Sequence, residues 1–150
     1  MEKAREATLS ILGELINICK EEYALFKTAS DKITNPYLRK TLDNCSEEKF
    51  SNIKKLAIEI QRLGGKSDGK DIEITQKVLE DFNSFNGDKE ILSHCEKIDN
   101  IVLNKYSNAM NEDILWEVIP VVAKQYFASV NLHCRIMYSF KSELPHAVFS

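Results

Sequence analysis

The sequence of residues 4–29 is AREATLSILGELINICKEEYALFKTA, and its apolar side chains recur at intervals of three and four positions. One stripe consists of Leu9, Leu12, Ile16, Cys19, Tyr23 and Phe26. A second stripe consists of Thr8, Ile11, Leu15, Ile18, Glu22 and Leu25. The interval is that of an α-helix, and two apolar stripes predict a helix packed on two sides, as in a helical bundle.

The same periodicity predicts four long helices, over about residues 4–29, 36–64, 88–110 and 112–142. Pro36 suits the first turn of the second helix, and Gly64-Gly65 suits its C-terminal end. Residues 66–87 are predicted to be a crossover, with a loop at 66–70 and a short amphipathic helix within 72–85. These features predict an all-α, ferritin-like four-helix bundle, a single domain over residues 1–150.

Prolines affect two predictions near the C-terminus. Pro120 lies inside the predicted fourth helix, so it should kink this helix and free the carbonyl group of Trp116. The segment from Glu143, which contains Pro145, is expected to be loose.

Composition narrows the class of protein. A chain of 150 residues with 43% hydrophobic and 29% charged residues is typical of one globular domain. The net charge is −3, and the bases form no block, so nucleic acid is not expected as a partner. No apolar run reaches the roughly 20 residues that span a bilayer. The N-terminal residues lack the features of a signal peptide, so a cytoplasmic location is expected.

The four cysteines, Cys19, Cys45, Cys95 and Cys134, form no Cys-x-x-Cys pair. Each falls on or beside an apolar stripe, which predicts reduced thiols packed in the core. A redox role is the alternative.

Each predicted helix also carries a polar residue within its apolar stripes: Glu22, Glu48, Asp99 and Gln125. With hairpins folded near residues 33 and 111, Glu22 lies within a turn of Glu48, and Asp99 lies close to Gln125. Four polar groups are therefore predicted to share one level of the bundle. Glu96 and His133 are further candidates for this layer.

Three interpretations of the layer are open. In the preferred one, the groups lie at helix flanks, or pair with Lys49, Lys124 and Lys54 and reach water. In the second, they form a closed hydrogen-bond network in which the carboxyl pKa values are raised. In the third, their oxygen atoms bind a metal ion. His133 is interpreted first as a hydrogen-bonded core histidine.

A di-iron carboxylate site needs a Glu from each of two helices and a Glu-x-x-His pair from each of the other two. The only such pair in the chain is Glu143-Leu144-Pro145-His146, which lies in the tail. Three histidines are also too few for a haemerythrin-type site. No cofactor is therefore predicted, and a metal ion at the polar layer is the less favoured alternative.

Several short segments resemble a bacterial ferritin-like four-helix-bundle family that carries a domain-of-unknown-function label. They are Leu12–Ala29, Ile60-Gln61-Arg62-Leu63-Gly64-Gly65, Asp88-Lys89-Glu90-Ile91-Leu92, Cys95-Glu96, Tyr106, Gln125 and His133. The resemblance covers about residues 8–141 and implies a fold, a metal-binding ancestry and a bacterial origin. It implies no established chemistry.

Two classes of function follow. The first, which the missing ligands favour, is a non-enzymatic bundle that acts by self-association or by binding a protein partner. The second is a divergent ferritin-like metal-binding protein, for iron oxidation or storage, with a carboxylate-only site. Trp116, Tyr126 and Phe127 are expected to be either an exposed patch for self-association or part of the core.

Overall fold

The structure is a computed structural model that describes residues 2–66 and 76–149, with side chains up to residue 138 except those of residues 76–79. Within these ranges all regular structure is helical, so the prediction of an all-α protein is confirmed. The helices are α1 (Glu2–Lys32), α2 (Pro36–Arg62), α3 (Gln76–Asn83), α4 (Asp88–Met110) and α5 (Ile119–Phe149).

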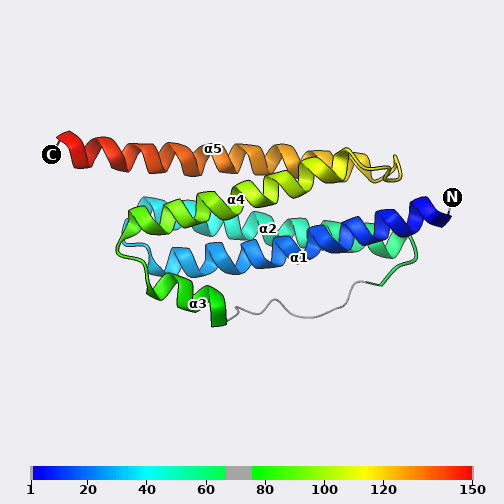
Figure 1. The fold of residues 1–150 in the computed structure, drawn as a ribbon, viewed down its shortest axis with the longest axis horizontal. Coiled ribbons are helices and arrows are strands. Elements are labelled where there is room, and N and C mark those ends of the chain that lie inside the picture. The colour runs from blue at the N-terminus through cyan, green and yellow to red at the C-terminus, as the bar shows by residue number, and fades with distance from the viewer. Residues whose placement is uncertain (1, 67–75, 150) are drawn as a thin grey trace.

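The four long helices are arranged as two antiparallel hairpins, α1 with α2 and α4 with α5 (Figure 1). Helices α2 and α4 run in the same direction, so the end of α2 and the start of α4 lie at opposite ends of the bundle. Helix α3 lies in this connection and packs beside α1. Most of the loop predicted at residues 66–70 lies outside the described residues.

Local sequence signals set the ends of α2. The Asn35 side chain accepts hydrogen bonds from the backbone N–H groups of Tyr37 and Leu38, at 2.9 and 3.2 Å. At the other end Gly64 has φ 83°, a left-handed conformation that favours glycine, and Gly65 N donates to Ile60 O. Both boundaries therefore follow from residues that satisfy the free backbone groups of a helix end.

Helix α5 differs from the prediction at both ends. It begins at Ile119 rather than near residue 112, so Pro120 lies in its first turn and does not kink it. Proline is tolerated there because the first N–H groups of a helix have no partner within the helix. The carbonyl group of Trp116 is not free, because it accepts a hydrogen bond from Ile119 N at 3.2 Å. The segment from Glu143, predicted to be loose, continues as helix to Phe149.

Each long helix turns one seven-residue repeat toward the centre, with buried residues alternately three and four positions apart. The stripe of α1 is Leu12, Leu15, Cys19, Glu22, Phe26, Ala29 and Ile33, and that of α2 is Leu42, Cys45, Lys49, Asn52, Leu56 and Glu59. The stripe of α4 is Leu92, Cys95, Asp99, Val102, Tyr106 and Ala109, and that of α5 is Val118, Val122, Gln125, Ser129, Leu132 and Ile136.

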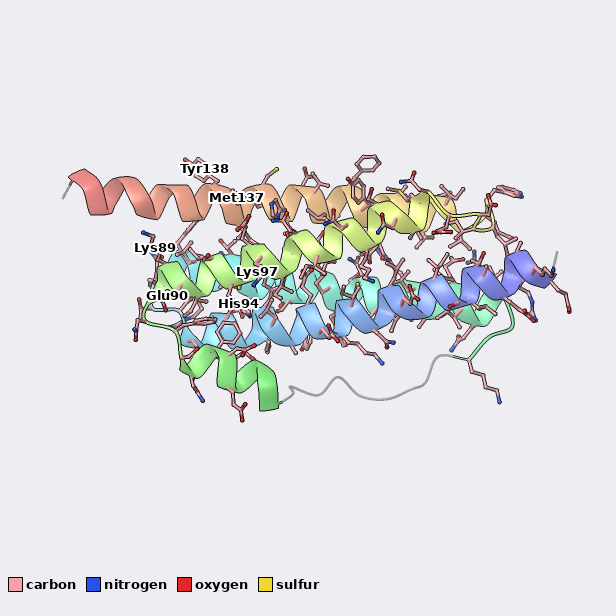
Figure 2. All side chains as sticks on the ribbon, viewed as in Figure 1. Lys89, Glu90, His94, Lys97, Met137 and Tyr138 are labelled. Atoms are coloured by element: carbon pink, nitrogen blue, oxygen red, sulfur yellow. The ribbon has the colours of Figure 1, made fainter. Side chains whose placement is uncertain are left out.

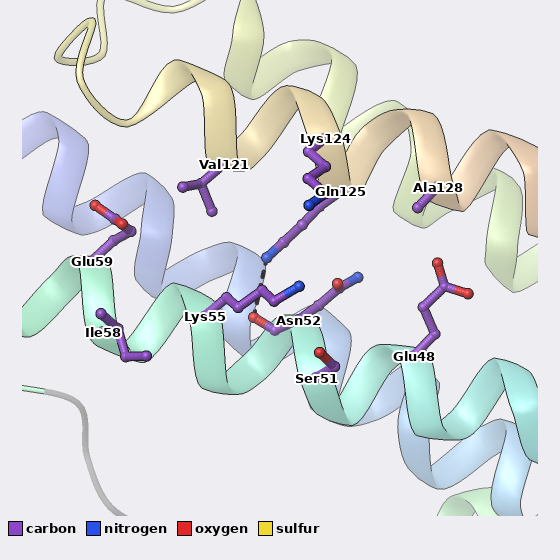
Figure 3. A pocket seen from close by; sticks show the side chains of 10 residues that line it. All are labelled: Glu48, Ser51, Asn52, Lys55, Ile58, Glu59, Val121, Lys124, Gln125 and Ala128. Carbon is purple, nitrogen blue, oxygen red and sulfur yellow. Dashed lines mark hydrogen bonds between the residues drawn. The ribbon is translucent and has the colours of Figure 1, made fainter.

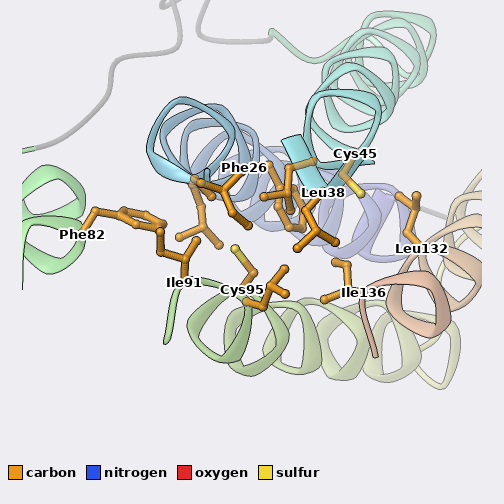
Figure 4. Packing of buried hydrophobic residues seen from close by; sticks show 13 residues of the cluster. Phe26, Leu38, Cys45, Phe82, Ile91, Cys95, Leu132 and Ile136 are labelled. Atoms are coloured by element: carbon orange, nitrogen blue, oxygen red, sulfur yellow. The ribbon is translucent and has the colours of Figure 1, made fainter. Parts of the chain in front are cut away.

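The apolar core is divided into two clusters along the bundle axis. One contains Phe26, Cys45, Cys95 and Leu132, together with Phe82 of α3 (Figure 4). The other includes residues on the far side of the same stripes: Cys19, Leu56, Val102 and Val122. In each stripe the residues that separate the two clusters are polar.

The prediction that all four cysteines are core thiols is wrong for one of them. Cys19, Cys45 and Cys95 are free and buried, whereas Cys134 is free and exposed. Cys134 lies between the buried positions Leu132 and Ile136, so its side chain leaves the helix on a different face.

Candidate functional site

The polar residues that separate the two apolar clusters form a charged layer, which consists of Glu22, Lys49, Asp99 and Ser129. They come from α1, α2, α4 and α5 respectively, and each is fully buried. Burying ions inside a bundle costs several kcal/mol each unless other groups compensate their charge. The contacts of these four residues therefore decide what the layer can do.

A chain of contacts runs through the layer from the surface to the interior. Lys49 Nζ lies 2.8 Å from Glu22 Oε1 and donates a hydrogen bond to Ser129 Oγ at 2.8 Å. His133 Nδ1 lies 2.8 Å from Asp99 Oδ2, and the His133 side chain is 17% exposed. The carboxyl groups of Glu22, on α1, and Asp99, on α4, are close enough for the charge of Asp99 to raise the pKa of Glu22.

The electrostatics of the layer favour the protonated forms of these two acids. Burial raises the pKa of Glu22, and the nearby charge of Asp99 raises it further, against the lowering effect of Lys49. Burial also raises the pKa of Asp99. For Lys49, burial disfavours the ammonium form, but the charges of Glu22, Cys19 and Asp99 and the contact with Glu22 together outweigh this and raise the pKa to about 12. Lys49 is therefore a fixed cation.

Counting protons gives the charge of the layer. Glu22 Oε2 and Asp99 Oδ1 have no hydrogen-bond partner among the described residues. Burial raises the pKa of Glu22 to about 8, so Glu22 holds a proton at neutral pH. One ammonium and one carboxylate then remain, and the layer is neutral.

A second polar network lies next to the charged layer. Tyr106 OH donates to Gln125 Oε1 at 2.7 Å, and Gln125 Nε2 donates to the backbone oxygen of Asn52 at 3.3 Å. Since the Tyr106 proton is used in this way, the Cys19 thiol is the donor in its 3.1 Å contact with Tyr106 OH. Burial raises the pKa of Cys19 to about 11, so this thiol stays protonated and unreactive at neutral pH.

The structure buries some of the residues predicted for the polar layer and places others outside the charged layer. Glu22, Asp99 and Gln125 are buried, and His133 binds Asp99. The raised carboxyl pKa values of the second interpretation describe Glu22 and Asp99. Of the preferred interpretation, the pairing with Lys49 is observed for Glu22, but the expected contact with water is wrong, because Glu22, Lys49 and Asp99 are fully buried. Gln125 pairs with Tyr106 instead of Asp99.

Two other candidates lie outside the charged layer. Glu48 is half-buried at the edge of the α2–α5 interface, because its neighbour Lys49 is the residue that α2 turns toward Glu22. Glu96 is half-buried and accepts a hydrogen bond from Asn100 Nδ2 at 3.1 Å. Helical geometry explains both results, because adjacent positions on a helix point about 100° apart.

The sequence predicted Lys49 as a pairing partner that reaches water, and it did not predict that Lys49 is fully buried. The signal was present, because Lys49 follows Cys45 by four positions and precedes Leu56 by seven in the repeat that α2 buries. Ser129 and Tyr106 were missed in the same way, although both continue the buried repeats of their helices.

The residues of the charged layer do not suit a carboxylate metal site. The Lys49 ammonium group already contacts the Glu22 carboxyl group and the Ser129 hydroxyl group, and a divalent ion beside it would be repelled. Within the part of the chain that the structure describes, no three His, Cys, Asp or Glu side chains form a metal-holding group.

Comparison with known families identifies the chain. Residues 7–112 match a family described as "Domain of unknown function (DUF2383)", a stretch that includes α4 and ends before α5. The chain belongs to this family. No curated protein matches the chain. None of the described helices combines the length and apolar composition needed to cross a membrane.

Proposed function

We propose that this member of the DUF2383 family is a non-enzymatic helical bundle that acts by binding another protein surface, with a second copy of the chain as the first candidate. The observation that carries the proposal is an exposed aromatic surface, called here the aromatic face of α5, which consists of Phe127 and Tyr138 on α5 and Trp116 in the turn before it. Their exposed fractions are 80%, 64% and 73%. Phe127 and Tyr138 are about three helical turns apart and so share a face, and Tyr138 points away from the bundle (Figure 2).

Charge supports the same surface. Residues 118–142 contain three bases, Lys124, Arg135 and Lys141, and no acid, although the whole chain has a net charge of −3. Exposed aromatic residues next to arginine are typical of the side chains that dominate protein interfaces. An acidic surface is the complement of this face, and the exposed Glu14 and Glu21 of α1 offer one on a second copy.

The proposal also includes the ferritin-like relationship, the bacterial origin and the cytoplasmic location that the sequence analysis predicts. Four long helices, a long connection between parallel helices and a charged layer at mid-bundle support a ferritin-like relationship. Bacterial origin and a cytoplasmic location are proposed with it. The alternative of an iron-oxidising or iron-storing protein has less support, because Lys49 is the cation that Glu22 contacts. Elemental analysis and an absorption spectrum after aerobic addition of ferrous iron test this alternative, and stoichiometric iron with an oxo-bridge band would favour it.

Light scattering over a range of protein concentrations tests the association. We expect a dimer or larger species for the wild type and a monomer for the Phe127→Ser/Tyr138→Ser double variant. Tyr37→Ser is the matched control, because Tyr37 is 70% exposed on α2, and it should associate like the wild type. A wild type that stays monomeric at every concentration refutes self-association. Association that persists in the double variant places the contact on another surface.

A further inference from the structure

A groove of about 390 Å³ separates α2 from α5 and is built from one stripe of each helix (Figure 3). Asn52 and Gln125 form its buried floor, and Ile58 and Val121 supply apolar walls. Its volume lies at the low end of the roughly 300–1,000 Å³ range of ligand pockets. The small side chain of Ala128 is on the α5 side, opposite the α2 stripe, where a larger residue would fill the space.

The floor of the groove contains a hydrogen-bond donor without a partner. Asn52 is 5% exposed and its side chain points into the space between α2 and α5 (Figure 3). Its Nδ2 atom receives no acceptor from the described residues. The Asn52 contact with Gln125 uses only the Asn52 backbone oxygen, so the side-chain amide has no structural role in that bond. A buried amide without a partner destabilises a protein, which makes this one a candidate for ligand contact.

The rim of the groove is positively charged. The ammonium groups of Lys55 and Lys124 are both drawn into the groove (Figure 3), and no described carboxylate forms an ion pair with either. Glu59 is neutralised by Arg62 at 3.2 Å, which leaves Glu48 as the only uncompensated acid of the lining. Two lysines and one acid give a single positive charge, which suits a ligand with a single negative charge.

We propose that the α2/α5 groove binds a small organic monocarboxylate. The carboxylate lies between Lys55 and Lys124 and accepts a hydrogen bond from Asn52 Nδ2. The apolar body of the ligand packs on Ile58 and Val121. The groove shares Lys124 with the basic surface of α5, but it lies between α2 and α5 and its binding does not depend on the association proposed above.

Titration calorimetry with 2-naphthoate tests the proposal, with 2-naphthalenemethanol as the uncharged counterpart. We expect saturable one-site binding of the acid and much weaker binding of the alcohol. Lys55→Gln and Lys124→Gln should each weaken binding about threefold, the scale of one exposed charge pair. Lys54→Gln is the matched control outside the groove, and it should bind like the wild type. Ala128→Leu, which fills the groove and keeps its charges, should weaken binding at least about tenfold, the effect of losing about 1.4 kcal/mol of binding energy.

Asn52→Leu supplies a readout other than binding. If the Asn52 side-chain amide serves a ligand and not the fold, Asn52→Leu without ligand should melt at a higher temperature than the wild type without ligand. The same variant should bind 2-naphthoate more weakly. A lower melting temperature for Asn52→Leu would show a structural amide and overturn the assignment of this residue to the ligand. Absence of saturable binding would overturn the site itself. Binding that survives Ala128→Leu but is lost in Phe127→Ser would place the probe on the aromatic face of α5, and this also overturns the proposal.

Discussion

Replacing Lys49 with Met removes the only cation of the charged layer and keeps most of the volume of the side chain. Lys49 and Glu22 are both fully buried and 2.8 Å apart. Removing one partner of such a buried pair costs about 3–5 kcal/mol, because the remaining charge has no compensation. A domain of this size has a free energy of unfolding of about 5–15 kcal/mol, so the variant should lose a large part of its stability.

The loss should depend on pH. Burial raises the pKa of Glu22 and Asp99 in the folded protein, so their contribution is fully present below the ordinary carboxyl pKa and is lost as the pH rises. Without Lys49, neutrality requires one further bound proton in the folded state. The free energy of unfolding of Lys49→Met should therefore fall more steeply with rising pH than that of the wild type, by up to about 1.4 kcal/mol per pH unit.

Urea denaturation followed by circular dichroism, at about pH 5 and about pH 8, measures this effect. Lys40→Met is the control, because Lys40 is exposed on the same helix, and it should stay within about 0.5 kcal/mol of the wild type. The Asp99→Asn/Lys49→Met double variant should recover most of the loss, because it removes the ammonium group together with the carboxylate that this group compensates. A Lys49→Met protein that stays within about 0.5 kcal/mol of the wild type at about pH 8 would refute the charged layer described here.

Three further predictions concern residues outside the charged layer. Leu56→Ala or Ile16→Ala should each lower the free energy of unfolding by about 2–5 kcal/mol, because both side chains are buried in the second apolar cluster; denaturation midpoints near that of the wild type would contradict this packing. Glu48→Gln should change the free energy of unfolding by no more than about 0.5 kcal/mol, since Glu48 is half-buried at the groove. A chelator should not lower the melting temperature of the wild type. A clear fall in that melting temperature, absent in Glu48→Gln, would favour the metal hypothesis. Burial against Phe82 and Phe85 lowers the pKa of His94, so the stability that neutral His94 contributes is present above its ordinary pKa of 6.5 and is lost as the pH falls. In urea denaturation, the free energy of unfolding of His94→Phe should therefore rise relative to that of the wild type as the pH drops. A difference that does not change with pH would argue against this burial.

The sequence determined the features of this protein that depend on neighbouring residues in the chain. The helical class follows from the apolar period, which is a local property of each helix. The start of α2 at Asn35-Pro36 and its end at Gly64 follow from groups that satisfy free N–H and carbonyl groups within one turn. The predicted third long helix, residues 88–110, has the bounds of α4, Asp88–Met110. Pro120 was misread because a proline in a first turn and one in a helix interior look the same when the helix start is unknown.

The tertiary structure alone decided which polar groups meet. The sequence placed Glu22 and Asp99 in buried stripes and put Glu48 in the same polar layer, whereas the structure turns Lys49, the next residue, toward Glu22. The rotation of α2 about its own axis decides between these two adjacent residues, and packing against the other helices fixes that rotation. His133 and Asp99 are 34 positions apart, and their contact depends on the axial register of α4 against α5. Two buried acids beside a fixed ammonium group are therefore a property of helices packed together, because no single helix brings these groups within a few ångströms of one another.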